Sequence, residues 1–574
     1  MDNKKIADTL EETADLMEIA GIDGFRIRSY RNAAQIVASL PEPIVTILQD
    51  SDRKITDIKG IGKSIASALK DLIERGSFSR RDEMLEKYPP TALELLKISG
   101  LGPKTIATIH HHFRISTIDG LEQLCRDGKL RELPRMGEKL EHRILRGIEI
   151  YKRNAGRFLI NFAHQTAIEL VNYLNEANGV DNITAAGSLR RGKETIGDVD
   201  LLVTGSKITD AIDRFVGHPS VNEILVHGDT KASVTVGREG LQVDVRALET
   251  TSYGAALQYF TGSKEHNVAL RERAVRMGLR LNEYGLYRND DGTKIAGQCE
   301  ADIYKTLGLS WIPPELRENT GEIEAAAEGT LPELIRADEI VADLHMHTTE
   351  SDGYFSMNEM AEAAHAKGYQ YIAITDHSKA LAMANGLDES RLLEQIKQIR
   401  EASEQWEDFT ILSGCEVDIL QNGKLDIDNE VLAQLDLVIA SVHSRMDIEA
   451  EKMTDRLLHV LENPYVNILG HPTGRLLLRR DPYVYDFERV ITEAGKCNVH
   501  IEINASPERL DLGFPHLRVA KSSGVKFTIS TDAHHIKHFD NMQYGVLSAR
   551  RGWLTVDDVL NTLSLEKFLN TLER

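Results

Sequence analysis

Cysteine is scarce in this sequence, and long apolar runs are missing from it. Only four cysteines occur in 574 residues, and none of them belongs to a CxxC pair. This argues against a disulfide framework and against a cysteine zinc site. No apolar run approaches the length of a membrane span, and the acidic, helix-like N-terminal stretch does not resemble a signal peptide. We therefore expect a cytoplasmic protein that does not bind a membrane.

A surplus of basic charge is also lacking. The formal net charge is -21, whereas nucleic-acid binding normally relies on a basic surface. The deficit is uneven, because residues 51–200 contain 25 basic and 21 acidic side chains, while residues 301–450 contain 10 and 30. The first half can therefore still bind DNA through local patches and backbone amides, with modest affinity and strong salt dependence.

Short amphipathic helices are predicted for residues 1–90. In FRIRSYRNAAQIVASL, residues 25–40, we expect Phe25, Ile27, Tyr30 and Ala34 to face a core, with the arginines between them pointing outward. The 41% hydrophobic content supports ordinary soluble cores, and the length of 574 residues predicts several compact units.

A glycine-rich pattern repeats in this region. It occurs as IKGIGKSIASALKDLI at 58–73, as ISGLGPKTIATIHHHF at 98–113 and more weakly as LPRMGEKLEHRIL at 133–145. The repeat resembles the helix-hairpin-helix motif, in which helix N–H groups meet a DNA phosphate. The resemblance implies DNA contacts at Gly60, Gly62, Lys63, Gly100, Gly102 and Lys104. Ordinary glycine-capped turns are the plain alternative. A nucleotide P-loop is rejected, because Asp57 stands where its first glycine is needed.

Two short strands carry acids at matching positions. In GSLRRGKETIGDVDLLV, residues 187–203, Asp198 and Asp200 are separated by one residue and so share one face of an extended chain. In LQVDVRAL, residues 241–248, the alternation predicts a half-buried strand with Asp244 on its polar face. Pairing of these strands would gather three carboxylates, a ligand set that suits Mg²⁺.

The plain alternative is a solvated polar face. The preceding GSLRR favours a phosphate site, because Gly187 and Ser188 offer donors and Arg190 or Arg191 can reach a phosphate with a planar guanidinium.

Together, G-S-x-R-R-G, G-D-V-D, V-D-V-R and YFTGS resemble the palm of family X DNA polymerases, the group that contains DNA polymerase beta. The resemblance implies that Asp198, Asp200 and Asp244 hold two Mg²⁺ or Mn²⁺ ions and that Asp244 also activates the primer 3′-hydroxyl. Gapped or primer-template DNA and dNTPs would be the partners. The incoming nucleotide and template would be contacted by Ser188, Arg191 and Gly197 at the triphosphate, by Tyr259, Phe260 and Gly262 at the sugar, and by Asn267 and Arg271 in the minor groove.

Two positions depart from the animal enzyme. Lys264 stands where that enzyme has an acid beside the incoming base. Ala68 stands where related polymerases have the Schiff-base lysine of a 5′-sugar-phosphate lyase, which argues against that activity here.

Histidines and acids recur in the second half of the chain. DLHMHTTESDG, residues 343–353, places His345 and His347 on one face of a predicted strand and Asp352 in the next loop. Helices are predicted at 356–368 and 388–405. Strand, ligand and helix in alternation predict an α/β barrel with its site at the carboxyl ends of the strands. Any single histidine, such as His365 or His459, is more simply explained as held by a hydrogen bond. The further predicted strand ends carry Asp376, His377, Glu416, His443, His471, Glu502, Asn504, Asp532 and His534.

This pattern resembles the polymerase and histidinol phosphatase (PHP) domain, a distorted barrel with a trinuclear metal site. The resemblance implies three ligand groups that bind up to three Mn²⁺ or Zn²⁺ ions and catalyse Mn²⁺-dependent 3′→5′ exonuclease or other phosphoesterase chemistry. The groups would be His345, His347, Glu416 and Asp532; Glu416, His443 and His471; and Asp352, His377 and His534.

The predicted fold class is multidomain α+β and α/β. We expect a helical DNA-binding domain at 1–90, a fingers-like domain at 91–150, a nucleotidyltransferase palm at 151–250, a thumb-like domain at 251–315, a linker at 316–340 and a (β/α)7 PHP barrel at 341–574. The expected function is gap-filling DNA synthesis in repair by a monomer, with a nuclease that trims 3′ ends. The alternatives are a DNA-end-binding scaffold and a polymerase whose barrel is a small-molecule phosphatase.

Overall fold

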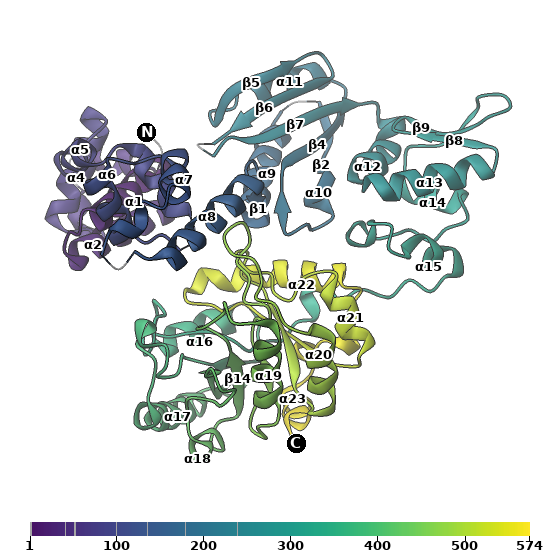
Figure 1. Cartoon of the computed structure of the whole chain (residues 1–574). Coiled ribbons are helices and arrows are strands. Elements are labelled where there is room, and N and C mark those ends of the chain that lie inside the picture. Colours follow the sequence, from purple (N-terminus) through teal and green to yellow (C-terminus); the bar gives the residue numbers. More distant parts are fainter. Residues whose placement is uncertain are drawn as a thin grey trace. The chain divides into compact units, whose positions relative to one another are not determined.

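The structure is a computed structural model that describes residues 3–573, except residues 41, 51–52, 99, 135, 178 and 238. It divides into two compact units, residues 1–155 and residues 156–574, each with its own hydrophobic cores (Figure 1). Among the described residues, no helix is both long and apolar enough to cross a membrane.

The first unit is built from helices around two successive cores. One core lies among the helices before residue 88, and the other lies mainly among residues 92–148. The helices are α1 (Asn3–Ile19), α2 (Gly24–Ser39), α3 (Ile44–Gln49), α4 (Lys63–Arg75), α5 (Ser79–Lys87), α6 (Pro103–Phe113), α7 (Ile118–Arg126) and α8 (Glu138–Arg153).

One predicted core residue of α2 is wrong. Ile27, Tyr30 and Ala34 are buried, but Phe25 is 70% exposed. Helix α2 begins at Gly24. Phe25 therefore lies in the first turn and outside the apolar stripe, in which Ile27, Tyr30, Ala34 and Val37 follow each other at helical spacing.

A five-stranded mixed sheet opens the second unit. Its strand order is β2-β4-β7-β6-β5, in which β4 and β7 are parallel neighbours. Leu201 and Val203 belong to a core that α9 and α11 cover, while Leu202 packs on the opposite face against α12. Asp198, Asp200 and Leu202 alternate with the buried set, so both acids lie on the face away from α9 and α11. The elements of the five-stranded sheet and its helices are α9 (Ile160–Asn175), β2 (Val180–Ala185), α10 (Gly187–Arg190), β4 (Asp198–Gly205), α11 (Ile208–Val216), β5 (Val221–His227), β6 (Lys231–Val236) and β7 (Leu241–Leu248). The strands β1 (Phe158–Leu159) and β3 (Thr195–Ile196) form a separate two-stranded antiparallel sheet.

A smaller three-stranded antiparallel sheet with helices follows. It contains α12 (Tyr253–Thr261), α13 (Lys264–Arg276), β8 (Leu279–Asn282), β9 (Gly285–Arg288), β10 (Lys294–Ala296) and α14 (Glu300–Thr306). Most of the next segment, residues 311–340, packs against this subdomain, while Ile335 and Ile340 near its end are buried in the barrel core. It carries α15 (Glu322–Glu328), and Ile312, Leu316, Ile323 and Leu334 are buried in the same core as Tyr304.

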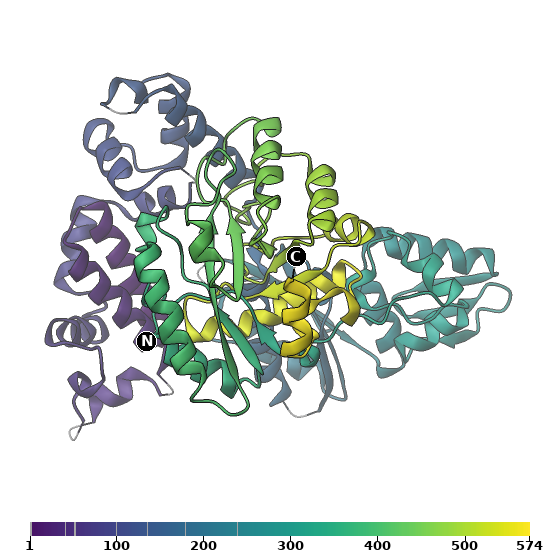
Figure 2. The ribbon, with the colours of Figure 1, turned by 90° about the horizontal axis from the view of Figure 1, so that it is seen from below.

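Seven parallel strands in sequential order form the barrel of the second unit. The first and last strands approach through the parallel bridge between Met346 and Ala533, which nearly closes the sheet. Figure 2 views the barrel from the side that carries the C-terminus. The strands are β11 (Ala342–Asp343), β12 (Tyr371–Ile374), β13 (Thr410–Asp418), β14 (Leu437–Ser441), β15 (Ile468–Leu469), β16 (His500–Asn504) and β17 (Phe527–Ser530).

Alternate strand residues enter two cores, as the two-residue period of a strand requires. Ile372 and Ile374 pack outward against helices, whereas Tyr371 and Ala373 pack inward with Phe568 of the C-terminal helix. The helices are α16 (Met357–Ala366), α17 (Glu389–Ser403), α18 (Asn429–Leu432), α19 (Ala450–Leu461), α20 (Phe487–Lys496), α21 (His516–Ser522), α22 (Met542–Arg551) and α23 (Leu565–Leu572). The predicted fold class, with helical domains, a mixed sheet and a distorted parallel barrel, is confirmed.

Candidate active sites

The first candidate site is the acidic face of the five-stranded sheet. Asp200 of β4 is the direct register partner of Asp244 of β7, and Asp198 is the partner of Gln242. Asp198 is exposed, whereas Asp244 is 9% exposed. The sheet therefore brings the three predicted carboxylates onto one surface.

A glycine turn fits tightly against these acids. Gly187 has φ +62°, and a Cβ at this position would lie 2.6 Å from Oδ2 of Asp200. The backbone N–H of Ala186 donates to the carbonyl of Asp200 at 2.8 Å. Ser188 follows in α10. Glycine is thus required where the turn approaches the carboxylate.

Burial and the mutual repulsion of the carboxylates both oppose ionisation on this acidic face. Burial raises the pKa of Asp200 to about 6, and the charges of Asp198 and Asp244 contribute to the rise. Asp244 accepts hydrogen bonds from the Ser233 hydroxyl and, at 3.0 Å, from Nε2 of Gln242. A divalent cation between the carboxylates would remove the repulsion, so the donor set fits the hard oxygen ligands of Mg²⁺ or Mn²⁺.

The arginines of the turn are already engaged. Nε of Arg191 lies 3.0 Å from Oε1 of Glu318, and its Nη1 donates to the carbonyl of Thr261. From α22, Nη1 of Arg551 donates to the Arg191 carbonyl at 2.9 Å and to Glu318 at 3.2 Å. A triphosphate at this turn would compete with Glu318 for the Arg191 guanidinium.

Arg190 belongs to a buried ion network. It makes two bonds to Glu300, at 2.9 and 3.0 Å, and Arg317 donates to the same carboxylate at 2.6 Å. Burial alone would raise the pKa of Glu300, but the two guanidinium groups lower it to about 2. The network links the glycine turn to the small subdomain. Of its members, only Arg190 belongs to a motif that was recognised in the sequence.

The predicted sugar and template contacts lie on α12 and α13. Asn267 donates to the Tyr259 carbonyl at 2.7 Å and accepts from Gln258 at 2.7 Å, so it shapes the YFTGS turn. The guanidinium of Arg246 lies 4.6 Å from the centroid of the Phe260 ring. Gly262 is buried with φ +67°, while Arg271 is exposed on α13. Gly197, which precedes β4, is partly buried.

The second candidate site is a cluster of imidazoles and carboxylates in the barrel. Glu416 of β13 lies at its centre, since one oxygen is 2.9 Å from Nε2 of His471 and 3.3 Å from Nε2 of His443. The other oxygen is 2.8 Å from Nδ1 of His377 and 3.5 Å from Nε2 of His345. A single carboxylate thus joins histidines from four strand ends.

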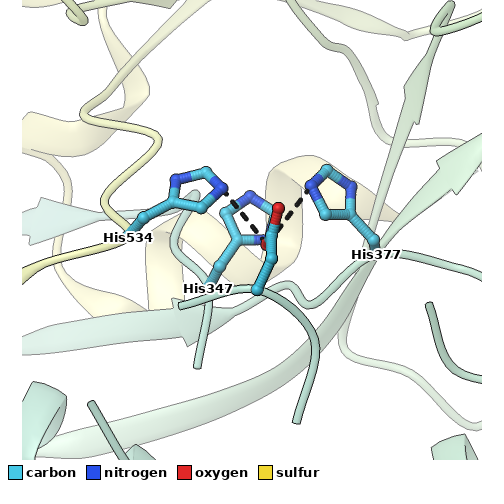
Figure 3. A group of neighbouring side chains, drawn as sticks. His347, His377 and His534 are labelled. Atoms are coloured by element: carbon cyan, nitrogen blue, oxygen red, sulfur yellow. Dashed lines mark ion pairs between the residues drawn. The ribbon is translucent and has the colours of Figure 1, made fainter. Parts of the chain in front are cut away.

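A second part of the cluster surrounds Asp352 and Asp532. Oδ1 of Asp352 lies 3.3 Å from His534 and 3.6 Å from His377. Figure 3 shows these two histidines converging with His347, which lies between them. Nε2 of His347 is 3.1 Å from Oδ1 of Asp532. Among the described residues, the groups with ligand atoms all within 4.8 Å are His347, Asp352, His377 and His534; His345, His347 and Asp532; and His377, Glu416 and His443.

The buried polar atoms of the cluster and the neutral form of His347 suit a metal site. Nε2 of His345 and Oε2 of Glu416 are buried, and among the described residues both atoms have only ion-pair contacts, without a hydrogen bond of normal geometry. Burial, together with the charges of His377 and His534, lowers the pKa of His347 to about 4, so this imidazole is the neutral, ligand form near pH 7. Unpartnered buried donor atoms are costly unless a ligand satisfies them, and mixed imidazole and carboxylate groups suit Mn²⁺, Zn²⁺ or Fe²⁺.

Known proteins match both halves of this arrangement. The family described as a helix-hairpin-helix domain matches residues 1–78, and the one described as a SAM-like helix-hairpin-helix tandem matches residues 92–149. The DNA polymerase beta thumb family matches residues 256–318, and the PHP domain family matches residues 343–506. Over its full length the chain is 38% identical to the DNA polymerase/3′-5′ exonuclease PolX of Bacillus subtilis (strain 168), with 100% of both chains covered.

The chain belongs to the PolX family.

Other proteins match parts of the chain. DNA polymerase lambda of Rattus norvegicus is 27% identical over 55% of this PolX chain and 56% of the rat protein. A protein named probable phosphatase from Thermoanaerobacter sp. (strain X514) is 31% identical over 39% of this chain and 91% of its own length. The crystal structure of a ternary complex of Leishmania infantum polymerase beta aligns with a TM-score of 0.27 and 21% identity, over 40% of this chain and 98% of that one.

The hairpin glycines of this PolX chain lie at helix starts. Gly60 has φ +92° and Gly100 has φ +86°, while Gly62 and Gly102 are the N-caps of α4 and α6. Lys63 and Lys104 are exposed in the first turns of these helices. Ala68, at the lyase position, is buried in the first core.

The predicted barrel ligands are contacted by residues that lie outside the three predicted ligand groups. Glu502 accepts from Nδ1 of His345 at 2.7 Å and from the His471 backbone at 2.5 Å. Asp418, which had no part in the predicted site, lies 3.5 Å from Nδ1 of His443. Asn504 donates to Asp532 at 3.0 Å.

Two expectations about the barrel change in detail. The first strand is shorter than expected, because β11 ends at Asp343, and His345 and His347 follow it. Asp376 accepts from Thr348 and from Gln395, so it orders a loop and lies outside the ligand groups.

Proposed function

We propose that this PolX chain fills short gaps during DNA repair with its palm and trims 3′ ends with its barrel. The observation that supports the proposal is the presence of two separate clusters of candidate ligands. One set is the register pair of Asp200 and Asp244 with Asp198, and the other is the histidine cluster around Glu416.

In the palm, Asp198, Asp200 and Asp244 would hold two Mg²⁺ or Mn²⁺ ions. Such ions neutralise charge on the transferred phosphoryl group and orient its attacking and leaving oxygens. Asp244 would also accept the proton of the primer 3′-hydroxyl. Its side chain is only 12% exposed and is held by Ser233 and Gln242, so its direction is fixed before substrate binds.

The turn and the YFTGS segment would bind the nucleotide. Ser188 and Arg191 would hold the triphosphate, with Gly197 allowing close approach. Tyr259, Phe260 and Gly262 would pack against the sugar, while Asn267 and Arg271 would face the minor groove. Lys264 at the start of α13 cannot supply the acidic contact of the animal enzyme, so the incoming base has one contact fewer of that kind.

In the barrel, Mn²⁺ or Zn²⁺ would be held by the histidines and carboxylates named above. A metal ion in such a site lowers the pKa of a water molecule and neutralises a phosphoryl oxygen. Glu502 accepts a hydrogen bond from Nδ1 of His345, which orients that imidazole, while Asp418 makes an ion-pair contact of 3.5 Å with Nδ1 of His443. Glu416 touches histidines on both sides and would keep their spacing.

The first unit would hold the gapped DNA by its backbone. Lys63, Lys104 and the N–H groups behind Gly60, Gly62, Gly100 and Gly102 would contact phosphates without reading bases. We also propose that the domains end at residues 90, 150, 250, 315 and 340. The protein would act as a monomer in the cytoplasm.

The test is a time course on end-labelled DNA with a one-nucleotide gap in the presence of Mn²⁺. We expect extension by one nucleotide when dNTPs are supplied and stepwise shortening of the 3′ end when they are withheld. Salt-sensitive gap binding with neither activity would favour the scaffold alternative, which the intact carboxylate set opposes.

A second candidate for the barrel is a small-molecule phosphatase. The observation that favours it is the likeness to the probable phosphatase, which this chain covers over 91% of its length. Hydrolysis of histidinol phosphate at a higher kcat/KM than of a primer terminus would assign the barrel to that chemistry, and the reverse ratio would assign it to DNA ends.

A further inference from the structure

A pocket opens beside the barrel cluster, and the palm supplies part of its wall. Its volume is about 590 Å³, within the range of pockets that enclose one small ligand. Asp532 and His534 link it to the ligand groups. The remaining wall consists of Leu476, Ser506, Pro507, Glu508, Arg509, His538 and Asn541 from the barrel and of Leu159 and Asn161 from the palm.

The palm wall is held rigidly against the barrel. One turn beyond Asn161, Nδ1 of His164 lies 3.3 Å from the Tyr544 hydroxyl. Arg475 donates to Glu194 at 2.8 Å. Leu510 and Tyr544 of the barrel are buried in the core that α9 shares with the five-stranded sheet. The start of α9 therefore packs tightly against the barrel, which fixes the position of Asn161.

Two polar side chains in this wall are incompletely bonded. Nη1 of Arg509 and Oδ1 of Asn161 are buried, and within the described part of the chain neither atom has a hydrogen-bond partner. Nε of Arg509 lies 3.6 Å from Oδ2 of Asp532. A donor beside the metal ligands and an acceptor in the wall of the same pocket are costly without partners, so they point to a ligand that has an anionic group and a hydroxyl.

We propose that this pocket is the terminal-nucleotide subsite of the nuclease and that both domains build it. Arg509 binds the phosphate of the terminal nucleotide next to the cluster, and Oδ1 of Asn161 accepts the hydrogen bond of its free 3′-hydroxyl. An internal nucleotide lacks that hydroxyl, so the contact favours a 3′ end. The inference rests on the proposed nuclease function and assigns to the palm a role in substrate choice by the barrel.

Binding of thymidine 5′-monophosphate and its 3′-deoxy analogue tests the assignment. Isothermal titration calorimetry with the Mn²⁺-loaded full chain, in an Asp200→Ala background that disables the palm ion site, isolates the barrel pocket. We expect the 3′-hydroxyl to strengthen binding about 3- to 10-fold, the worth of one hydrogen bond. Asn161→Ala should abolish this preference and leave the 3′-deoxy analogue unchanged, while Gln165→Ala, at an exposed position of α9, should preserve it.

Trimming supplies a second readout. Asn161→Ala should raise the KM for a 3′-hydroxyl end and leave hydrolysis of p-nitrophenyl phosphate unchanged. Asn161→Leu, which keeps the branching and the number of heavy atoms of the side chain, should behave in the same way. Nucleotide incorporation by the chain that retains Asp200 reports correct folding.

A preference for the 3′-hydroxyl that survives both Asn161 substitutions would overturn the proposal, as would a parent chain without any preference. If the unsubstituted chain did not trim 3′ ends at all, the proposed nuclease function itself would be refuted.

Discussion

The palm and the barrel present candidate cation ligands in opposite ways. The palm gathers three carboxylates from two neighbouring strands, and Asp198 is exposed. The barrel gathers imidazoles and carboxylates from many strand ends, and His345, His347 and Glu416 are at most 1% exposed. An open acidic face leaves room for a triphosphate and its ions, whereas an enclosed mixed cluster can hold resident ions before substrate arrives. Four predictions sharpen this contrast.

The largest expected effect is on stability near the palm, because a buried ion network, and not a set of metal ligands, stabilises that region. Glu300→Gln should lower the free energy of unfolding of the second unit by about 3 kcal/mol at pH 7, because it leaves Arg317 buried with less compensation. Thermal unfolding is the measurement, with Glu328→Gln at an exposed site of α15 as the matched control.

The pH dependence follows from the same group. The pKa of Glu300 is about 2 in the folded chain and near 4.5 when unfolded, so its stabilisation is complete above the unfolded value and is lost as the pH falls from about 4.5 toward 2. The Gln variant should lose this acid-dependent part. If the free energy of unfolding fell equally with pH for both proteins in this range, the network would not have this role.

The next effect concerns the tight turn of the palm. Gly187→Ala places a Cβ 2.6 Å from Oδ2 of Asp200 at a φ of +62°. Displacement of the carboxylate should reduce single-nucleotide incorporation about 100-fold, since a shift near 1 Å has that cost in other sites. Trimming should be unaffected. Incorporation at the unsubstituted rate would show that the turn does not set the position of Asp200.

A smaller effect is expected in the support of the barrel cluster. Glu502→Gln weakens the bond to Nδ1 of His345 and should reduce Mn²⁺ affinity about 10- to 100-fold. Calorimetry with the full chain measures it. Glu488→Gln, exposed on α20, should leave the affinity unchanged. A loss in palm activity as well would mean that the two sites are coupled.

The smallest effect is at the DNA backbone. Lys63→Ala should lower gap affinity a few-fold and reduce the slope of log K against log salt by about 1, because one phosphate contact is removed. Lys70→Ala is the control, since Lys70 lies on the same helix and pairs with Glu74 at 3.9 Å. Identical slopes for both variants would remove Lys63 from the interface.

Much of both sites was predictable because the ligands stand in local patterns. The spacing of Asp198 and Asp200 indicated a common face, and the alternation around Asp244 indicated the polar face of a second strand. The recurrence of histidines after apolar stretches indicated the barrel. Contacts between distant segments were not predictable in this way. Arg551 bonds to the carbonyl of Arg191, and Asn161 lines a barrel pocket, although no local pattern connects these positions.

Phe25 illustrates another limit. A helical stripe gives the direction of a side chain only where the helix continues on both sides, and α2 begins one residue earlier. The packing of residues 311–340 against the small subdomain likewise depends on a partner surface that is far away in sequence.

The central claim is that one chain contains two independent active sites, and single substitutions in each site test it most directly. On the gapped, end-labelled DNA with Mn²⁺, Asp198→Ala should abolish extension and preserve 3′ trimming, while His347→Ala should abolish trimming and preserve extension. If both substitutions removed both activities, the two-site account would be wrong.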